Sequence, residues 1–189
     1  MKKRLETKPT LYPLPAVVVG TYDAEGHPDA MTAAWAGICC SEPPCLTVGI
    51  RESRLTYENL LRRKALTVHV PSVDLVKETD YFGLVSGRNE DKLAKTGMTC
   101  TPGSEVDAPV IDRFPLVLEC RLVSTTKLGS HMLVVAEIVA VAAEESVLTS
   151  QGELDAQALA PLCYGPAGYY GLGELAGKAF SVGKELLRP

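Results

Sequence analysis

The chain has 189 residues, 46% of them hydrophobic and 22% charged, which is typical of one folded domain with a substantial core. Its formal net charge of −4 argues against nucleic acid as the main partner, because phosphate binding requires a concentrated excess of Lys and Arg. The start of the chain lacks the apolar run of a secretory signal, and the most apolar segment, residues 132–143, is shorter than the roughly 20 residues that cross a bilayer. We expect one domain over residues 1–189, in the cytoplasm, without a membrane partner.

The first quarter of the chain predicts antiparallel strands. Residues 14–22 contain the β-branched run Val17–Val19, and Asp23–Gly26 after them suits a tight turn. We expect the return strand within Ala30–Pro44 and a third strand at Cys45–Arg51, whose residues alternate between two environments.

Helices are predicted in the middle of the chain. Ser53 is the expected N-cap of a short amphipathic helix that follows it. After a strand at Ala65–Val70, a second helix opens at Pro71–Ser72, and a polar helix is expected over Asn89–Thr96. The apolar residues expected to face the core from the second helix are Val73, Val76, Tyr81, Phe82 and Leu84.

The third quarter predicts a long hairpin, with strands at Leu116–Val123 and Met132–Ala143 joined by Lys127–His131. Along the chain, strands therefore come first, short helices follow, and a long hairpin comes last. A parallel doubly wound sheet would need strands and helices that alternate throughout. The order favours a mainly β fold of the α+β type, an antiparallel β-barrel or sandwich with inserted short helices.

The six cysteines include no CxxC pair and no repeated spacing of metal ligands, so we expect no metal site. Reduced, mostly buried thiols are the ordinary interpretation, while a redox role stays open for Cys39 and Cys40. The sequence also lacks the phosphate-loop, zinc-protease and hydrolase motifs. Gly171–Ala176 matches a dinucleotide fingerprint, but the chain ends too soon after it for the acidic residue that the fingerprint needs.

Two segments have the composition of a ligand site. Ala30–Trp35 combines small residues with the only tryptophan, which permits close approach to a flat ligand. Arg51–Thr56 leads from a strand end into a helix start with two guanidiniums and two hydroxyls. Free N–H groups and arginines together make an anion site suited to phosphate. His131 follows Gly129 in a hairpin connection, where a loop side chain is well placed for a ligand.

Three segments, Ala30–Trp35, Cys40–Pro44 and Arg51–Leu60, resemble the flavin reductase-like, FMN-binding split-barrel family, most of all its flavoredoxin-type members. The resemblance covers about Leu11–Gly171. It implies a homodimeric Greek-key split barrel that binds FMN near the dimer interface. The residues assigned to FMN by the resemblance and by the anion-site pattern are Asp29, Met31, Thr32, Ala33, Ala34, Trp35, Arg51, Ser53, Arg54, Thr56, Lys92, His131 and Tyr164.

In this assignment Asp29–Trp35 line the isoalloxazine ring, and Ser53, Arg54 and Thr56 receive the phosphate with Lys92 as a further cation. His131 and Tyr164 close the pocket. Many members of the family have Asn at the position of Asp29. A carboxylate cannot donate a hydrogen bond unless it is protonated, so three placements stay open: Asp29 turns outward, contacts a ribityl hydroxyl, or lowers the flavin potential.

The resemblance implies a flavoprotein oxidoreductase that passes electrons from NAD(P)H or a protein donor to flavin, a metal or another acceptor, with His131 as the candidate catalytic proton-transfer residue. Many members that release flavin carry Gly-Asp-His where this chain has Gly129-Ser130-His131. This difference motivates an alternative, an electron carrier that holds FMN tightly and has no small-molecule substrate. A third possibility is a split barrel for another planar ligand such as haem.

Overall fold

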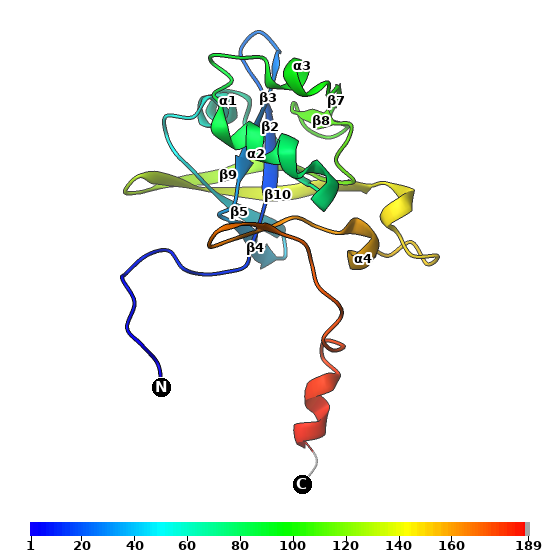
Figure 1. Ribbon diagram of the computed structural model, residues 1–189. Coiled ribbons are helices and arrows are strands. Elements are labelled where there is room, and N and C mark those ends of the chain that lie inside the picture. Colours follow the sequence, from blue (N-terminus) through cyan, green and yellow to red (C-terminus); the bar gives the residue numbers. More distant parts are fainter. Residues whose placement is uncertain (188–189) are drawn as a thin grey trace.

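The computed structural model describes residues 1–187, and its centre is a seven-stranded antiparallel sheet (Figure 1). In spatial order its strands are β3 (Pro28–Ala33), β2 (Val17–Tyr22), β6 (Ala65–Val70), β9 (Leu116–Leu128), β10 (His131–Ala143), β5 (Pro44–Ile50) and β4 (Ala36–Ser41). Strand β3 also lies against β5, although four strands separate them in this order, so the sheet curls toward a barrel. The expected antiparallel, mainly β fold is confirmed.

The sheet has an apolar core on each face. Val18 and Val19 are neighbours in β2 and point to opposite faces, as strand geometry requires. Val19 belongs to the barrel interior with Leu66 and Val134, whereas Val18 packs with Phe82 of the helical layer. Strand β6 is buried on both faces, and its two polar side chains, Thr67 and His69, are hydrogen-bonded to backbone carbonyls.

The helices α2 (Val76–Leu84) and α3 (Lys92–Thr96) form a helical layer on one face of the sheet, where Phe82 and Leu93 pack with Val18. The small ladder of β7 (Cys100–Pro102) and β8 (Pro109–Ile111) belongs to the same layer through Ile111 (Figure 1). Helix α1 (Leu55–Arg63) packs Tyr57 and Leu60 against the barrel-interior core instead. Two predictions about these helices were wrong. The N-cap position of α1 is Arg54 rather than Ser53, and no side chain caps it. Leu84 is 73% exposed, since it ends α2 on the solvent side and Phe82 packs the core instead.

The long hairpin is confirmed, and β9 extends beyond its predicted end. Residues 124–128 are mostly polar and exposed, so composition alone gives no strand signal there. They pair with the first residues of β10, from His131↔Leu128 onward. Gly129 closes the turn with a φ of 57°, a conformation that a residue with a side chain rarely adopts.

A second, three-stranded sheet combines β1 (Leu14–Pro15), β11 (Cys163–Gly165) and β12 (Gly168–Tyr170). The short helix α4 (Ala156–Leu159) comes just before β11 in the chain. Short 3-10 turns lie at Val73–Leu75, Glu145–Val147 and Val182–Leu187. Within residues 1–187, no helix is both long enough and apolar enough to span a bilayer.

Candidate functional site

A cavity of about 220 Å³ lies where the end of β3, the end of β5, the start of α1 and the start of β10 converge. It brings together predicted residues from four separated parts of the sequence. The residues that line it are Met31, Thr32, Ala33, Ala34, Trp35, Gly49, Ile50, Arg51, Arg54, His131 and Tyr164.

Trp35 stands between β3 and β4, so the predicted single return strand is in fact two strands separated by Ala34 and Trp35. The Trp35 carbonyl accepts a hydrogen bond of 2.7 Å from the amide of Gly49 in β5. A Cβ on Gly49 would lie 3.3 Å from the Trp35 Cβ, so a larger residue there would push the tryptophan away. With its backbone fixed in this way, the indole remains 44% exposed at the cavity.

Arg51 follows β5, and Arg54 occupies the N-cap position of α1. Within residues 1–187, neither guanidinium has a carboxylate within 4.0 Å. By contrast, Arg62, Arg63 and Arg88 each form an ion pair. Two cations without acidic partners, beside a helix N-terminus whose first amides lack helical acceptors, form a site for an anion.

The His131 ring lies against Trp35, with ring centroids 4.4 Å apart and the two planes tilted by 43°. Its Nδ1 lies 2.8 Å from the Ser130 hydroxyl, so Nε2 is the nitrogen that remains for a ligand. Burial, and then the positive charge of Arg51, lowers the pKa of His131 below its ordinary value. A lowered pKa keeps the imidazole neutral at pH 7. Tyr164 reaches the cavity from β11, where it pairs with Leu14.

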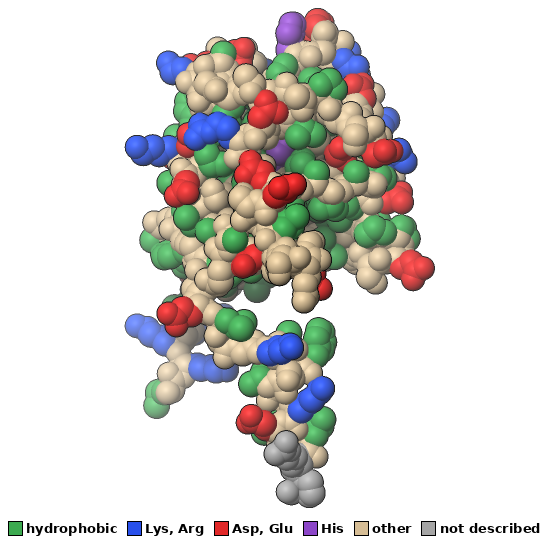
Figure 2. Space-filling view, turned by 90° about the vertical axis from the view of Figure 1, so that its right-hand side faces the viewer, with side chains coloured by type: hydrophobic (Ala, Val, Ile, Leu, Met, Phe, Trp, Pro, Cys, Tyr) green, Lys and Arg blue, Asp and Glu red, His purple; other side chains and the backbone are tan. Residues whose placement is uncertain are grey.

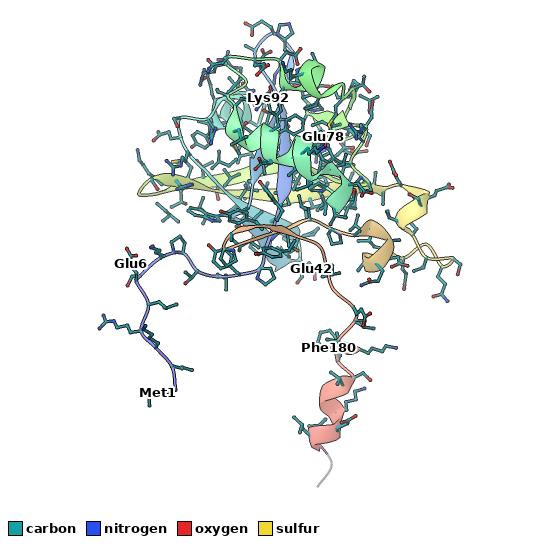
Figure 3. The ribbon with its side chains drawn as sticks, viewed as in Figure 1. Met1, Glu6, Glu42, Glu78, Lys92 and Phe180 are labelled. Atoms are coloured by element: carbon teal, nitrogen blue, oxygen red, sulfur yellow. The ribbon has the colours of Figure 1, made fainter. Side chains whose placement is uncertain are left out.

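Asp29, Thr56 and Lys92 do not line this cavity. The Asp29 Oδ1 atom lies 2.9 Å from the Lys92 ammonium, and its Oδ2 accepts a 2.9 Å hydrogen bond from the Thr56 hydroxyl. The side chains of Lys92 and Asp29 are only 2% and 6% exposed, and Lys92 also donates to the Ala30 carbonyl. Figure 3 labels Lys92 on α3, in the helical layer. We call Asp29, Thr56 and Lys92 the buried cluster.

The Asp29 carboxylate contacts Lys92 and Thr56 and does not line the cavity. It is buried rather than turned outward to solvent, and its relation to the ribityl chain and to the flavin potential stays a prediction. The polar helix expected over Asn89–Thr96 shortens to α3, with Asp91 as its cap and Lys92 turned inward. Ser53 lies in the exposed turn between Arg51 and Arg54 and does not line the cavity.

Sequence reasoning missed Gly49, whose small size lets Trp35 pack closely against β5. A glycine in the interior of a predicted strand was the available signal, because such a residue often marks close approach of another backbone. Among residues 1–187, the one group of potential metal ligands is Asp23, Glu25 and His27 in the exposed β2–β3 turn. The Asp23 carboxylate is already engaged there by the Glu25 and His27 amides and the His27 ring.

Residues 10–173 match the family model described as flavin reductase like domain. The flavoredoxin of Desulfovibrio vulgaris (Miyazaki F) is 42% identical and has a TM-score of 0.93, with 97% of this chain and 100% of that chain covered. The flavoredoxin of Methanosarcina acetivorans is 32% identical with a TM-score of 0.90, covering 98% and 100%. A Shewanella frigidimarina structure with a split barrel domain, 23% identical over 89% and 87% with a TM-score of 0.80, shares the fold.

Proposed function

The chain belongs to the flavin reductase-like domain family, and on that premise we propose that it is an FMN-binding flavoprotein oxidoreductase. The observation that carries the proposal is the pairing of an exposed tryptophan face with two arginines that have no acidic partner, in one cavity. FMN has a flat aromatic ring at one end and a phosphate at the other, so the types of residue present fit the group.

The residues take these roles in the proposal. Trp35 offers flat apolar surface to the ring or its ribityl chain, and Ala33 and Ala34 leave room for close approach. Arg51 and Arg54, with the Ser53 turn between them, bind the phosphate through charge-assisted hydrogen bonds. Met31, Thr32 and Tyr164 complete the lining of the cavity.

The buried cluster acts indirectly. Thr56 in α1 donates a hydrogen bond to Asp29 in β3, and Lys92 ties Asp29 and the Ala30 carbonyl of β3 to α3. The ring-facing residues follow Asp29 in β3, and the arginines flank the start of α1. The cluster therefore holds the two halves of the site at a fixed spacing, in place of the direct contacts to FMN that the sequence predicted for its three members.

When bound, FMN supplies hydride and single-electron transfer. His131 is the proposed proton-transfer residue, because its neutral ring keeps Nε2 available at the cavity while Ser130 holds Nδ1. We propose NAD(P)H or a redox protein as electron donor, and flavin, a metal centre or another acceptor as the recipient.

A second candidate is an electron carrier that keeps FMN and has no small-molecule substrate. The hydrogen bond between Ser130 and His131 favours it, since an uncharged Ser130 gives His131 no anionic partner that would stabilise its protonated form. The similarity to the flavoredoxins is compatible with both candidates.

The purified protein, reconstituted with FMN, tests the proposal by its absorption spectrum and by anaerobic mixing with NADH and with NADPH. We expect a bound flavin spectrum. Rapid bleaching by one nicotinamide supports the oxidoreductase that uses NAD(P)H, whereas slow bleaching by both supports a protein donor or the carrier. Absence of flavin binding, both by absorbance and by calorimetry, would contradict the proposal. Haem absorbance in place of flavin absorbance would favour another planar ligand.

A further inference from the structure

The hairpin of β4 and β5 carries three of the six cysteines. Cys39 and Cys40 lie in β4 with exposed thiols, and Cys45 lies near the start of β5 with a buried thiol. Free cysteine is among the most buried residue types in proteins, so two exposed thiols on one strand are unusual. None of the three lines the cavity, which leaves them outside the proposed flavin site.

The thiols of β4 are accessible to a small reagent. Strand β4 is the last strand of the seven-stranded sheet, and both Cys39 and Cys40 are exposed on it. Figure 3 labels Glu42 in the turn that joins β4 to β5. Both terminal segments of the described chain extend from this side of the body, and their outer parts stand clear of it (Figures 1 and 2).

Cys40 and Cys45 are directly opposite each other in the β4–β5 ladder. Opposed residues of an antiparallel pair have Cα atoms about 4.5–5.5 Å apart and side chains on the same face. A disulfide needs a Cα separation of about 4.4–6.8 Å, so this pairing supplies the backbone geometry without movement of either strand. Cys39 differs, because the register shifts between Ile38 and Cys40 and leaves it without a residue opposite.

The Cys40 side chain has one weak contact to give up. Its Sγ donates a 3.4 Å hydrogen bond to the Glu42 carbonyl in the turn. A thiol is a weak donor, so rotation of this side chain toward Cys45 costs little. Burial, and then the charge of Cys40 and Cys39 in their ionised forms, raises the pKa of Cys45. A thiol with a raised pKa is a poor leaving group, so a disulfide that includes Cys45 is reduced slowly.

We propose that Cys40 and Cys45 form a reversible redox modification site, which reacts with a low-molecular-weight disulfide such as glutathione disulfide to close a bond across the hairpin. The Cys40 thiolate attacks one sulfur of the reagent, its S–S bond breaks, and one glutathione leaves as a thiolate that takes up a proton. The Cys45 thiolate then attacks the Cys40 sulfur and displaces the second glutathione. The two protein thiols lose two electrons and two protons, and the reagent takes up both.

The bond would fix the turn end of the hairpin. Near the other end, the Trp35 carbonyl already accepts a hydrogen bond from the Gly49 amide. The oxidised hairpin is therefore held at both ends, and β4 should separate from β5 less often. The modification itself does not depend on a bound ligand, and only its effect on Trp35 at the cavity rests on the proposed function.

Thiol counting on the flavin-free full-length chain tests the site. After incubation of the folded protein with glutathione disulfide, we expect two fewer reactive thiols in the denatured chain, and full recovery with dithiothreitol. Alkylation before reduction and a second label after it should place the second label on Cys40 and Cys45 by tandem mass spectrometry. No loss of thiols, a lasting glutathione adduct without the bond, or a second label on another pair would overturn the proposal.

Three variants separate the pair from its neighbour. Cys40→Ser changes an exposed side chain and should form no protein disulfide, whereas Cys45→Ala should stop at the mixed disulfide with glutathione on Cys40. Cys39→Ser is the matched control, because it removes the other exposed thiol of β4 and should still form the bond. A protein disulfide in Cys40→Ser, to the extent seen in the unaltered chain, would contradict the assignment.

Hydrogen exchange tests the consequence for the hairpin. The amides of β4 should exchange at least about threefold more slowly in the oxidised than in the reduced protein, because opening of this edge strand becomes rarer. Equal exchange in the two forms would contradict closure of the hairpin by the bond. None of these experiments uses flavin, so a failure to bind FMN would remove the proposed function and leave this inference standing.

Discussion

Strand β3 connects two groups of charged residues that differ in whether their charges have partners. Near its start, Asp29 is buried, forms an ion pair with Lys92 and accepts a hydrogen bond from Thr56. Beyond its end, the cavity holds Arg51 and Arg54, which have no carboxylate within 4.0 Å among residues 1–187. A buried charge must keep its partner, because removal of one half of a buried pair is costly, whereas an unpaired charge at a cavity is available to a ligand. Changes in the first group should alter stability, and changes in the second should alter binding.

His69 and His131 differ in the same way, in whether all their polar atoms have partners within the protein. His69 is fully buried in β6, where its Nε2 accepts a 2.9 Å hydrogen bond from the Ile111 amide and its Nδ1 donates to the Val18 carbonyl. His131 has one nitrogen on Ser130 and the other open to the cavity. The predictions below test the contrast, from the largest expected effect to the smallest.

Asp29→Ala should lower the free energy of unfolding by about 3–5 kcal/mol, because it leaves the Lys92 ammonium buried without its partner. Denaturant unfolding followed by circular dichroism measures the change. The Asp29→Ala/Lys92→Met variant is the control and should recover most of the loss, since no charge then remains buried. A loss under about 1 kcal/mol in the single variant would mean that the ion pair is not structural.

Acid should destabilise the protein through His69. Burial lowers the pKa of His69 from 6.5 to about 4, so between these values the unfolded chain binds a proton that the folded chain does not. Stability is therefore lost as pH falls through this window, by on the order of 3 kcal/mol. Unfolding curves from pH 7 to pH 4.5 measure it. His69→Gln can keep both hydrogen bonds and should have a flatter profile, and identical profiles for the two proteins would refute the assignment.

Arg54→Ala should weaken FMN binding by about 10- to 100-fold through loss of charge-assisted hydrogen bonds, with a change in unfolding free energy within about 0.5 kcal/mol. Calorimetric titration with FMN measures the affinity. Arg62→Ala is the matched control on the same helix, because Arg62 is paired with Glu58 and lies outside the cavity. Equal losses in the two variants would indicate a general charge effect instead of a phosphate contact.

Gly49→Ala should have the smallest effect, a loss of FMN affinity below about tenfold, because Trp35 must move by only a few tenths of an ångström to accept the new methyl group. Gly37→Ala on β4 is the control, since an added Cβ there meets nothing within 4 Å. The tryptophan emission maximum should shift in Gly49→Ala only. Unchanged emission and unchanged FMN affinity in both variants would contradict the proposed packing of Trp35 against Gly49 in β5.

The long apolar elements could be predicted from the sequence because they carry their own pattern. Strand β6 spans Ala65–Val70 as expected, and the hairpin of β9 and β10 was found from its apolar runs. The local sequence pattern did not predict that the return strand is divided at Ala34 and Trp35, because this break depends on the contact of Trp35 with Gly49 in β5. The extra length of β9 depends likewise on pairing with β10.

For the site, the sequence predicted the cavity residues from Met31 to Trp35 together with Arg51, Arg54, His131 and Tyr164. It did not predict that Lys92 and Thr56 would turn toward Asp29. All three are polar side chains on segments far apart in sequence, and burial of an ion pair is decided by how α1, α3 and β3 pack. A sequence pattern records that a cation is present but not which anion it meets.

The comparison of FMN with riboflavin tests the central claim most directly, because the two ligands differ only in the phosphate. Calorimetric titration of the unaltered protein should show FMN binding at least about tenfold tighter than riboflavin, and the Arg51→Ala/Arg54→Ala variant should lose that preference while still binding the ring. Equal affinity of the unaltered protein for both ligands, or no binding of either, would contradict the assignment of this cavity to FMN.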